Sequence, residues 1–218
     1  MENITILGDG SWGTACAKVL SDNAIPVTLW CYNPEVATTI AQNGENTQYL
    51  PGISLDTYYL HPTTSHEKAI SDAHIVLFAI PVKYLRAVLT QCVKFAHSGQ
   101  TWVSLSKGIE QETGYLPTQI VADTLSASVT QAAMAGPSFA RELANRKPTG
   151  LLYAPAHTSA FSTVQSYFET PYCAVTAIDD TIGLQIAGAL KNIYAIAAGM
   201  LDTYVSAHNT QALLITYA

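Results

Sequence analysis

A turn that contains three glycines, residues 8–13 (GDGSWG), constrains the fold of this chain more than any other feature. It directly follows the short apolar run Ile4–Leu7, and a helical pattern of apolar residues begins right after it. A second strand pattern at residues 27–31 follows that helix and ends in the turn-forming pair Asn33-Pro34. Strand, tight turn, helix and strand in this order predict a βαβ unit with parallel strands and a right-handed crossover.

The same alternation of apolar runs and helical patterns continues to residue 178. The predicted strands after the first two are residues 75–80, 102–105 and 132–135, with 151–154 and 172–175 as candidate edge strands. The predicted helices between them are residues 84–95, 118–125 and 139–144. Such alternation is typical of an α/β fold with a Rossmann-like, doubly wound parallel sheet. We therefore assign residues 1–178 to a domain of this class.

The composition changes at residue 179. Asp179 and Asp180 are suited to cap a helix, and the residues from there to Leu201 carry no charge except Lys191. A helix that is apolar on every side is expected to be buried. It predicts the start of an all-helical domain over residues 179–218. The apolar run at residues 212–216 predicts that this domain is incomplete.

Charge and apolar patterning argue against several other classes of protein. The net charge is −6 and Lys and Arg form no basic stripe, so nucleic acid is not an expected partner. The longest apolar stretch, residues 193–201, is well short of the roughly 20 residues that span a bilayer. The acidic N-terminus is unlike a secretory signal, so we expect a cytoplasmic chain without membrane insertion. Neither the cysteines nor the histidines have the spacing of metal ligands, so we expect free thiols and no metal.

The glycine turn has the G-x-G-x-x-G pattern of dinucleotide-binding folds, in the strand-to-helix context that such folds require. Gly8 permits the tight turn, Gly10 lets the backbone approach a pyrophosphate, and Gly13 lets the helix pack closely on the sheet. The N–H groups of the first helical turn then face the anion. A glycine-rich turn without a ligand is the alternative interpretation.

Two neighbours of this turn leave the choice of cofactor open. Asp9 either lies near the pyrophosphate, where its charge weakens binding, or points to solvent. The second strand ends in Tyr32 and Asn33, where NAD-dependent enzymes usually have an acid and NADP-dependent enzymes a basic group. The sequence pattern therefore does not distinguish NAD from NADP.

Two lysines are candidates for chemistry on a substrate. Lys191 is the only charged residue of the apolar helix, where burial would lower its pKa and let it accept a proton from a hydroxyl group. A lysine that reaches the surface, or that pairs with Asp202, is the alternative. Lys107 and Ser138 each follow a predicted strand, at the sheet edge where open α/β folds bind ligands, although each alone also fits an ordinary loop.

Five blocks of sequence, taken together, resemble the bacterial NAD(P)-dependent glycerol-3-phosphate dehydrogenase family. The blocks are GDGSWGTACA (8–17), ENTQYLPG (45–52), SLSKGIEQETG (104–114), GPSFARELA (136–144) and ALKNIYAIAAGM (189–200). Their order and spacing agree with the family over nearly the whole chain. The last three blocks go well beyond a general dinucleotide-binding pattern.

The resemblance implies a function and a set of site residues. The function is interconversion of dihydroxyacetone phosphate and sn-glycerol 3-phosphate by hydride transfer with NAD(P)H, which supplies phospholipid synthesis. Lys191 would accept the proton and contact the substrate, together with Lys107, Gly136 and Ser138. The residues implied to contact the cofactor are Gly8, Gly10, Ser11, Trp12, Gly13, Tyr32, Lys107 and Ala140.

The chain departs from the family pattern in several places. Tyr32 stands where relatives often carry a basic residue, and Tyr217 stands in place of an arginine. The glycines that the family carries shortly after Asp202 are also replaced. The family has a further helical region that grips the substrate phosphate, and its full-length members are expected to form homodimers. A truncated remnant that binds the dinucleotide without turnover is therefore the alternative to an active dehydrogenase.

Overall fold

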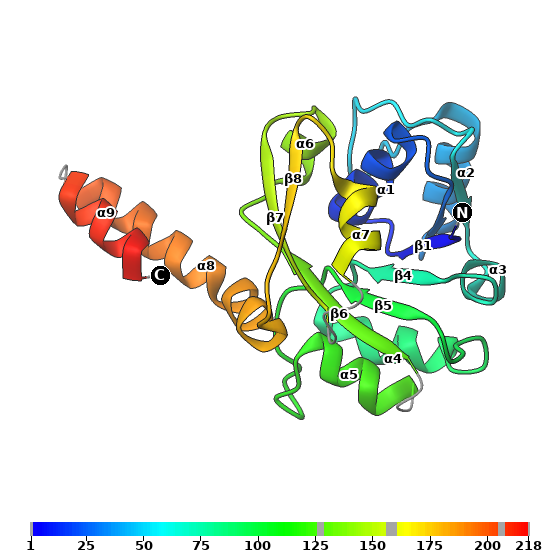
Figure 1. Cartoon of the computed structure of the whole chain (residues 1–218). Coiled ribbons are helices and arrows are strands. Elements are labelled where there is room, and N and C mark those ends of the chain that lie inside the picture. Colours follow the sequence, from blue (N-terminus) through cyan, green and yellow to red (C-terminus); the bar gives the residue numbers. More distant parts are fainter. Residues whose placement is uncertain (1, 126–128, 156–160, 205–207, 218) are drawn as a thin grey trace.

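The computed structural model describes residues 2–125, 129–155, 161–204 and 208–217, and an eight-stranded sheet forms its centre (Figure 1). The strands are β1 Ile4–Leu7, β2 Val27–Trp30, β3 Leu60–Thr63, β4 Ile75–Phe78, β5 Thr101–Ser104, β6 Thr130–Ala135, β7 Thr149–Pro155 and β8 Cys173–Ala177. The helices are α1 Ser11–Asp22, α2 Pro34–Asn43, α3 His66–Ile70, α4 Val82–Cys92, α5 Pro117–Leu125, α6 Ala140–Ala144, α7 Phe161–Phe168, α8 Thr181–Tyr204 and α9 His208–Tyr217.

The predicted doubly wound α/β fold is confirmed. Each strand that the sequence predicts is present, and the two candidate edge strands form as β7 and β8. Only β8 lies at the edge of the sheet, because β7 lies between β8 and β6 and is antiparallel to β6. The sequence does not predict β3, because its residues LHPT include a proline and only Leu60 among them is buried. Proline is tolerated there because β3 lies at the edge of the sheet. The short helices α2, α3 and α7 were also not predicted.

The direction of strand addition reverses at β1, in the sheet order β3-β2-β1-β4-β5-β6-β7-β8. The chain first adds β2 and β3 on one side of β1 and then crosses to add β4, β5 and β6 on the other, all parallel. Leu7 at the end of β1 lies between Trp30 and Phe78 of the neighbouring strands. The carboxyl ends of β1, β4, β5 and β6 therefore meet along one edge, where folds of this type open their binding crevice.

Helices cover both faces of the sheet (Figure 1). One hydrophobic cluster joins the sheet to α1, α2, α6 and α7, and its members include Ala15 and Phe168. The second cluster joins the opposite face to α3, α4 and α5, and its members include Leu89 and Ile120. Because both faces are packed, the strand ends that surround the crevice are held by the core of the protein.

Helix α8 is exposed along most of its length, which contradicts the prediction that it is buried on all faces. Asp180 caps it as expected, since its Oδ1 accepts a hydrogen bond from Gly183 N at 2.7 Å. The first turns pack on β6 and β7, where Leu184 and Gln185 are buried. The helix then leaves the sheet and packs with α9 (Figure 1). The division of the chain at residue 179 stays a prediction.

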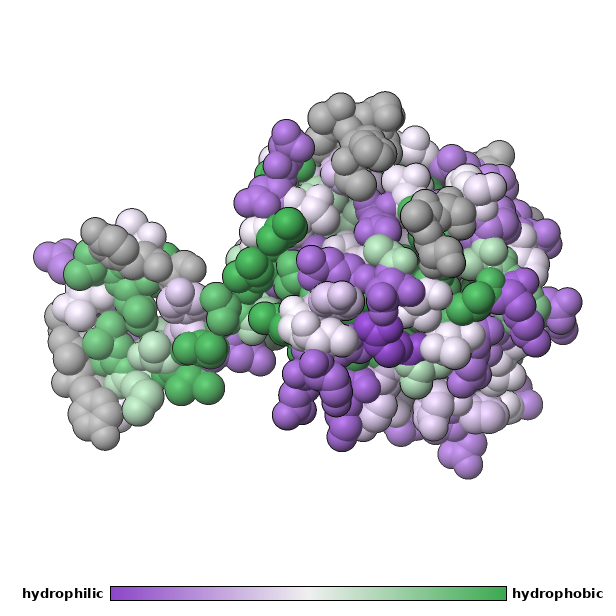
Figure 2. Space-filling model, turned by 90° about the horizontal axis from the view of Figure 1, so that it is seen from below, coloured by the Kyte–Doolittle hydropathy of each residue, from purple (hydrophilic) through white to green (hydrophobic). Residues whose placement is uncertain are grey.

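The apolar side chains of this projecting pair of helices reach the surface (Figure 2). The exposed large apolar residues on it are Ile182, Ile186, Ile193, Ile196, Met200, Leu213 and Ile215. The prediction of burial was wrong because an apolar pattern shows that a helix can be buried but does not provide the partner. By length and composition, Thr181–Thr203 is also apolar enough to cross a membrane, with a hydropathy of 1.3, a test that core helices of soluble proteins pass as well.

Candidate active-site cleft

The glycine turn between β1 and α1 combines close packing with open space. Gly8 has φ +119°, and a Cβ there would lie 2.8 Å from Ala79 O. A Cβ on Gly13 would lie 2.0 Å from Gly8 O, whereas a Cβ on Gly10 would meet no atom within 4 Å. The fold therefore requires Gly8 and Gly13, and the space beside Gly10 is free for a ligand.

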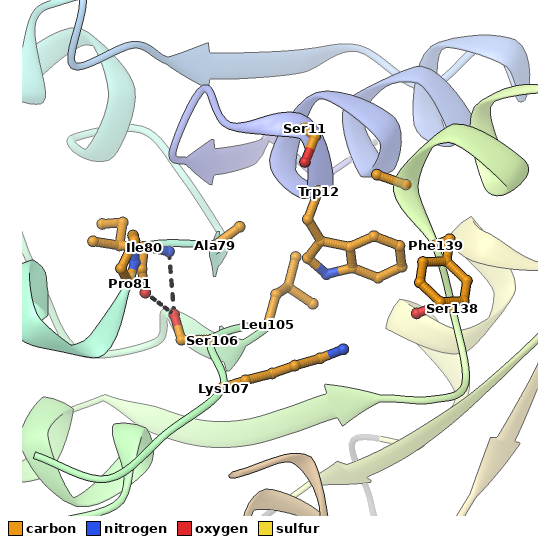
Figure 3. Close-up of a pocket in the computed structure, with 11 residues that line it drawn as sticks. Ser11, Trp12, Ala79, Ile80, Pro81, Leu105, Ser106, Lys107, Ser138 and Phe139 are labelled. Atoms are coloured by element: carbon orange, nitrogen blue, oxygen red, sulfur yellow. Dashed lines mark hydrogen bonds between the residues drawn. The ribbon is translucent and has the colours of Figure 1, made fainter. Parts of the chain in front are cut away.

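The amino end of α1 opens toward this space. Gly10 is its N-cap, no side chain forms a capping hydrogen bond, and the first turn contains no acidic residue. The N–H groups of this turn and the positive end of the helix dipole are therefore suited to bind an anion. Ser11 and Trp12 belong to the same turn and line the adjacent cavity (Figure 3).

Asn46 ties the ENTQYLPG block to the glycine turn, a role that its sequence pattern does not predict. Asn46 is 1% exposed, and its amide donates to Asp9 O and to Thr14 Oγ1, both at 2.8 Å. Its Oδ1 accepts a hydrogen bond from Tyr49 N at 3.1 Å. A single asparagine in a polar loop produces no periodic signal, so only these contacts identify it.

Replacing Asn46 with alanine should lower the free energy of unfolding by about 1–3 kcal/mol, because Tyr49 N and Asp9 O lose buried hydrogen-bond partners. Urea titration measures this change. Asn145→Ala is the matched control, since the exposed Asn145 also donates to a backbone carbonyl, that of Arg141. Equal stability of the two variants would contradict the role of Asn46.

Asp9 is directed to the end of β2. Its Oδ2 accepts a hydrogen bond from Asn33 N at 3.1 Å, and the residue is 7% exposed. The interpretation that Asp9 points to solvent is therefore wrong. Tyr32, by contrast, is 78% exposed and stands edge-on to Trp30, with ring centres 6.4 Å apart.

A cavity of about 280 Å³ opens where the carboxyl ends of β1, β4, β5 and β6 meet (Figure 3). The structure brings several of the residues predicted from the sequence into its lining, namely Ser11, Trp12, Lys107, Ser138 and Ala140. These residues come from α1, from the segments that follow β5 and β6, and from α6. Lys191, Tyr32, Gly136 and the three glycines of the turn are not among the lining residues.

The sequence did not single out Ile80, Ser106 and Phe139, which also line the cavity. Ser106 Oγ accepts a hydrogen bond from Ile80 N at 3.1 Å and donates to Ile80 O at 2.6 Å, so it joins the ends of β4 and β5 (Figure 3). Ile80 follows β4 and Ser106 follows β5, at the edge of the sheet where the carboxyl ends of the parallel strands meet. The positional rule that identified Lys107 therefore could have found them as well.

Gly136 and Ser138 follow β6 at the same edge. Ser138 is buried, and its Oγ donates to Gly136 O at 3.3 Å. A Cβ on Gly136 would lie 2.3 Å from Gly150 O in β7. The close packing of β6 against β7 therefore requires glycine at this position, whatever further role its backbone has toward a ligand.

Lys107, which lines this cavity, and Lys191, which does not, approach each other beside it. Lys191 Nζ lies 5.1 Å from the centre of the Phe139 ring, and Lys107 extends from the end of β5 toward the same residue (Figure 3). A Cβ on Gly188, one turn before Lys191, would lie 3.8 Å from Lys107 Cγ. Loss of hydration and the charge of Lys191 lower the pKa of Lys107. Helix α8 thus places Lys191 beside Phe139, which lines the cavity.

The structure tests two of the expectations for Lys191, its complete burial and its pairing with Asp202. The residue is half-buried, not enclosed on all sides as the prediction of a buried helix required. In the described part of the chain it forms no ion pair with Asp202, whose Oδ1 accepts a hydrogen bond from Gln211 Nε2 at 2.5 Å. Its charged end lies over the Phe139 ring and is close enough to Lys107 to lower the pKa of that lysine.

Replacing Lys191 with methionine should raise the pKa of Lys107, because a nearby positive charge is removed while a long apolar side chain remains. The contribution of burial persists, so the Lys107 pKa should stay below that of a free lysine. NMR titration of ¹³C-labelled lysine side chains measures both effects. Lys68→Met on α3 is the control and should leave the pKa unchanged. A Lys107 pKa that does not rise in Lys191→Met would refute the proximity.

Arg86 on α4 secures the segment that carries Lys107. Its guanidinium binds both carboxylate oxygens of Glu110, at 2.9 and 2.7 Å, and Thr113 Oγ1 donates to the same carboxylate at 2.6 Å. The Arg86 guanidinium lowers the pKa of Glu110, which is buried. This network links the SLSKGIEQETG block to α4 and accounts for its mixture of acidic and hydroxyl residues.

Comparison with known proteins agrees with this geometry. The chain matches the family models NAD-dependent glycerol-3-phosphate dehydrogenase N-terminus over residues 3–160 and NAD-dependent glycerol-3-phosphate dehydrogenase C-terminus over residues 180–218. Glycerol-3-phosphate dehydrogenase (NAD(P)+) of Geobacter metallireducens is 39% identical over 217 residues, 99% of this chain and 64% of the relative. The protein of the same name from Bacillus subtilis is 38% identical over 218 residues, 99% of this chain and 63% of the relative.

Solved structures give the same result. The crystal structure of glycerol-3-phosphate dehydrogenase from Coxiella burnetii superposes with a TM-score of 0.88 and 29% identity, covering 99% of this chain and 65% of that protein. The corresponding yeast structure gives a TM-score of 0.86 and 26% identity, covering 98% of this chain and 66% of that protein. The chain thus spans about 64% of the length of the curated relatives it matches. Two family models, together with relatives aligned over nearly every residue, establish that the chain belongs to the NAD-dependent glycerol-3-phosphate dehydrogenase family.

Proposed function

We propose that this chain binds NAD(P)H and interconverts dihydroxyacetone phosphate and sn-glycerol 3-phosphate. One observation carries the proposal: Lys107 lines a cavity beside the uncapped amino end of α1, and Lys191 lies near it, over the ring of Phe139, which lines the same cavity. The helix end suits the pyrophosphate of a dinucleotide, and the lysines suit a phosphorylated ketone. Membership of the dehydrogenase family supplies the reaction class.

The residues present fit a nicotinamide dinucleotide. The open space beside Gly10 admits a pyrophosphate, and the free N–H groups of α1 face it. Trp12, Ser11 and Ala140 line the adjacent cavity, where the indole provides an apolar surface for a ring. When bound, this cofactor supplies or accepts the hydride.

The two lysines have different roles in the proposed reaction. Lys191 accepts the proton of the substrate hydroxyl during oxidation and returns it to the carbonyl oxygen during reduction. Lys107 stabilises negative charge on that oxygen and attracts the substrate phosphate. Ser138 Oγ, which lies in the same cavity, orients the substrate, together with the backbone of Gly136. The two like charges favour binding of an anionic substrate over a neutral one.

The cellular setting forms part of the same proposal. We place the reaction in the cytoplasm, where it supplies glycerol phosphate for phospholipids. All four cysteines are free and buried, as expected of a chain in a reducing compartment. Residues 1–178 bind the cofactor, and residues 179–218 begin the helical domain for substrate and dimer contacts.

A turnover assay with a panel of ketones tests the proposed function. NADH and NADPH binding is first measured by fluorescence titration, and loss of reduced-cofactor absorbance is then followed after addition of dihydroxyacetone phosphate, dihydroxyacetone or pyruvate. We expect the reduced cofactor to be oxidised when dihydroxyacetone phosphate is added, and not when either of the two ketones that lack phosphate is added. Tight cofactor binding without oxidation by any ketone would instead support the alternative of a dinucleotide-binding remnant.

A further inference from the structure

We propose that the carboxylate of Asp9 selects NAD(H) over NADP(H), an inference that rests on the proposed function. In doubly wound dinucleotide folds, an acid at the end of β2 binds the 2′-hydroxyl of the adenosine ribose, whereas a basic group accommodates the 2′-phosphate of NADP. In this chain the end of β2 supplies Tyr32 and Asn33, and neither is charged. Instead, Asp9 of the glycine turn places its carboxylate at the end of β2, next to Asn33 N.

The Asp9 carboxylate is positioned to accept hydrogen bonds from a ribose. Oδ2 accepts one from Asn33 N at 3.1 Å, and no other partner of this carboxylate is found among the described residues. A carboxylate has acceptor sites for about four hydrogen bonds, so most of its capacity is free. The hydroxyl groups of an unphosphorylated ribose are donors that match it.

The surrounding contacts hold this carboxylate in place. Asn46 donates to the carbonyl oxygen of Asp9, which fixes the backbone of the glycine turn. On the other side, Asn33 Oδ1 accepts a hydrogen bond from Glu35 N at 2.9 Å, and Asn33 Nδ2 donates to Gln48 Oε1 at 3.1 Å. Asp9 is also 7% exposed, so little open space is available for it to swing away from a phosphate.

The segments around the end of β2 supply no lysine or arginine to offset this charge. The sequence contains neither Lys nor Arg between Lys18 and Lys68, a span that includes β2, α2 and β3. In the described part of the chain, no salt bridge reaches Asp9.

The nearest helix end and cavity also disfavour a phosphate. The amino end of α2 is capped by Asn33 and carries Glu35 in its first turn. A cavity of about 80 Å³ beside it has Glu35, Asn46 and Gln48 in its lining, which includes no Lys or Arg. A 2′-phosphate would therefore meet a fixed negative charge without a compensating positive one.

Binding titrations with NADH and NADPH test this inference without relying on activity. We expect the dissociation constant for NADPH to exceed that for NADH by at least about tenfold, since like charges at contact distance change binding equilibria by such factors. Asp9→Asn should narrow this ratio, mainly through tighter binding of NADPH. Asp56→Asn is the matched control: it removes the same charge and a similar hydrogen bond, that from Tyr58 N at 2.9 Å, and should leave the ratio unchanged.

A second measurement needs no variant, so it applies even where Asp9→Asn does not fold. Displacement of bound NADH by adenosine 5′-monophosphate should be stronger than displacement by adenosine 2′,5′-bisphosphate. Equal or tighter binding of NADPH and of the bisphosphate would overturn the role of Asp9 while leaving the proposed function intact. Failure of both NADH and NADPH to bind would overturn the proposed function together with this inference.

Discussion

Replacing Lys191 with methionine is expected to lower turnover of dihydroxyacetone phosphate by at least about 10²-fold, the usual effect of losing a positioned proton donor or acceptor. Methionine keeps a long apolar stem against Phe139, so the packing of α8 should persist. The affinity for NADH should stay near that of the parent chain, because the phosphate-binding turn is unchanged. Steady-state kinetics and cofactor titration together measure both quantities.

The control for this prediction is Lys68→Met, which removes an exposed helical lysine from α3. It should leave turnover and cofactor affinity unchanged. If Lys191→Met retained turnover within a few-fold of the parent chain, Lys191 would not be the proton carrier. If instead cofactor affinity collapsed along with turnover, the lysine would have a structural role.

Gly13→Ala is expected to lower the free energy of unfolding by about 3 kcal/mol or more, at the upper end of what overpacking costs. The new Cβ would lie 2.0 Å from Gly8 O, a backbone atom within the turn itself, so no flexible side chain can move to relieve the clash. Gly8 in turn lies against Ala79 O of the next strand end. Thermal and denaturant unfolding measure the loss.

Gly10→Ala, with Gly150→Ala in β7 as its control, separates folding from binding at the glycine turn. Neither added Cβ meets an atom within 4 Å, so both variants should keep the stability of the parent chain. Gly10→Ala should nevertheless weaken NADH binding, because its methyl group occupies the space assigned to the pyrophosphate. Gly150→Ala in β7 should leave binding unchanged. Unimpaired binding by Gly10→Ala would show that the phosphate lies elsewhere.

The sequence predicts the sheet well because buried parallel strands are short apolar runs separated by helical patterns. The sequence does not predict elements whose structure depends on contacts with distant parts of the chain. The edge strand β3 contains Pro62 and little apolar sequence, and pairing with β2 alone defines it. Helix α8 has the composition of a buried helix, but beyond its first turns it packs mainly with α9 in the described structure, and most of its large apolar side chains stay exposed. Composition shows whether a segment can be buried, but the rest of the fold determines whether a packing partner is present.

The same distinction applies to the residues of the site: some can be identified from the sequence pattern, and others only from their contacts in the structure. Lys107 and Ser138 follow from a positional rule, because residues after parallel strands collect at one edge of the sheet. Asn46 does not, since its importance lies in hydrogen bonds to Asp9 O and Thr14 Oγ1 across a long loop. Asp9 is visible in the sequence, yet the direction of its carboxylate appears only in the contact with Asn33 N. The roles given to these residues in binding and catalysis stay predictions.

Transfer of deuterium tests the central claim most directly. The chain is mixed with NADH that carries deuterium on the transferred position of C4, dihydroxyacetone phosphate is added, and the product is analysed by mass spectrometry and NMR. The account predicts sn-glycerol 3-phosphate with deuterium at C2, formed by the parent chain and much more slowly by Lys191→Met. Bound NADH that never transfers its deuterium to dihydroxyacetone phosphate would contradict it.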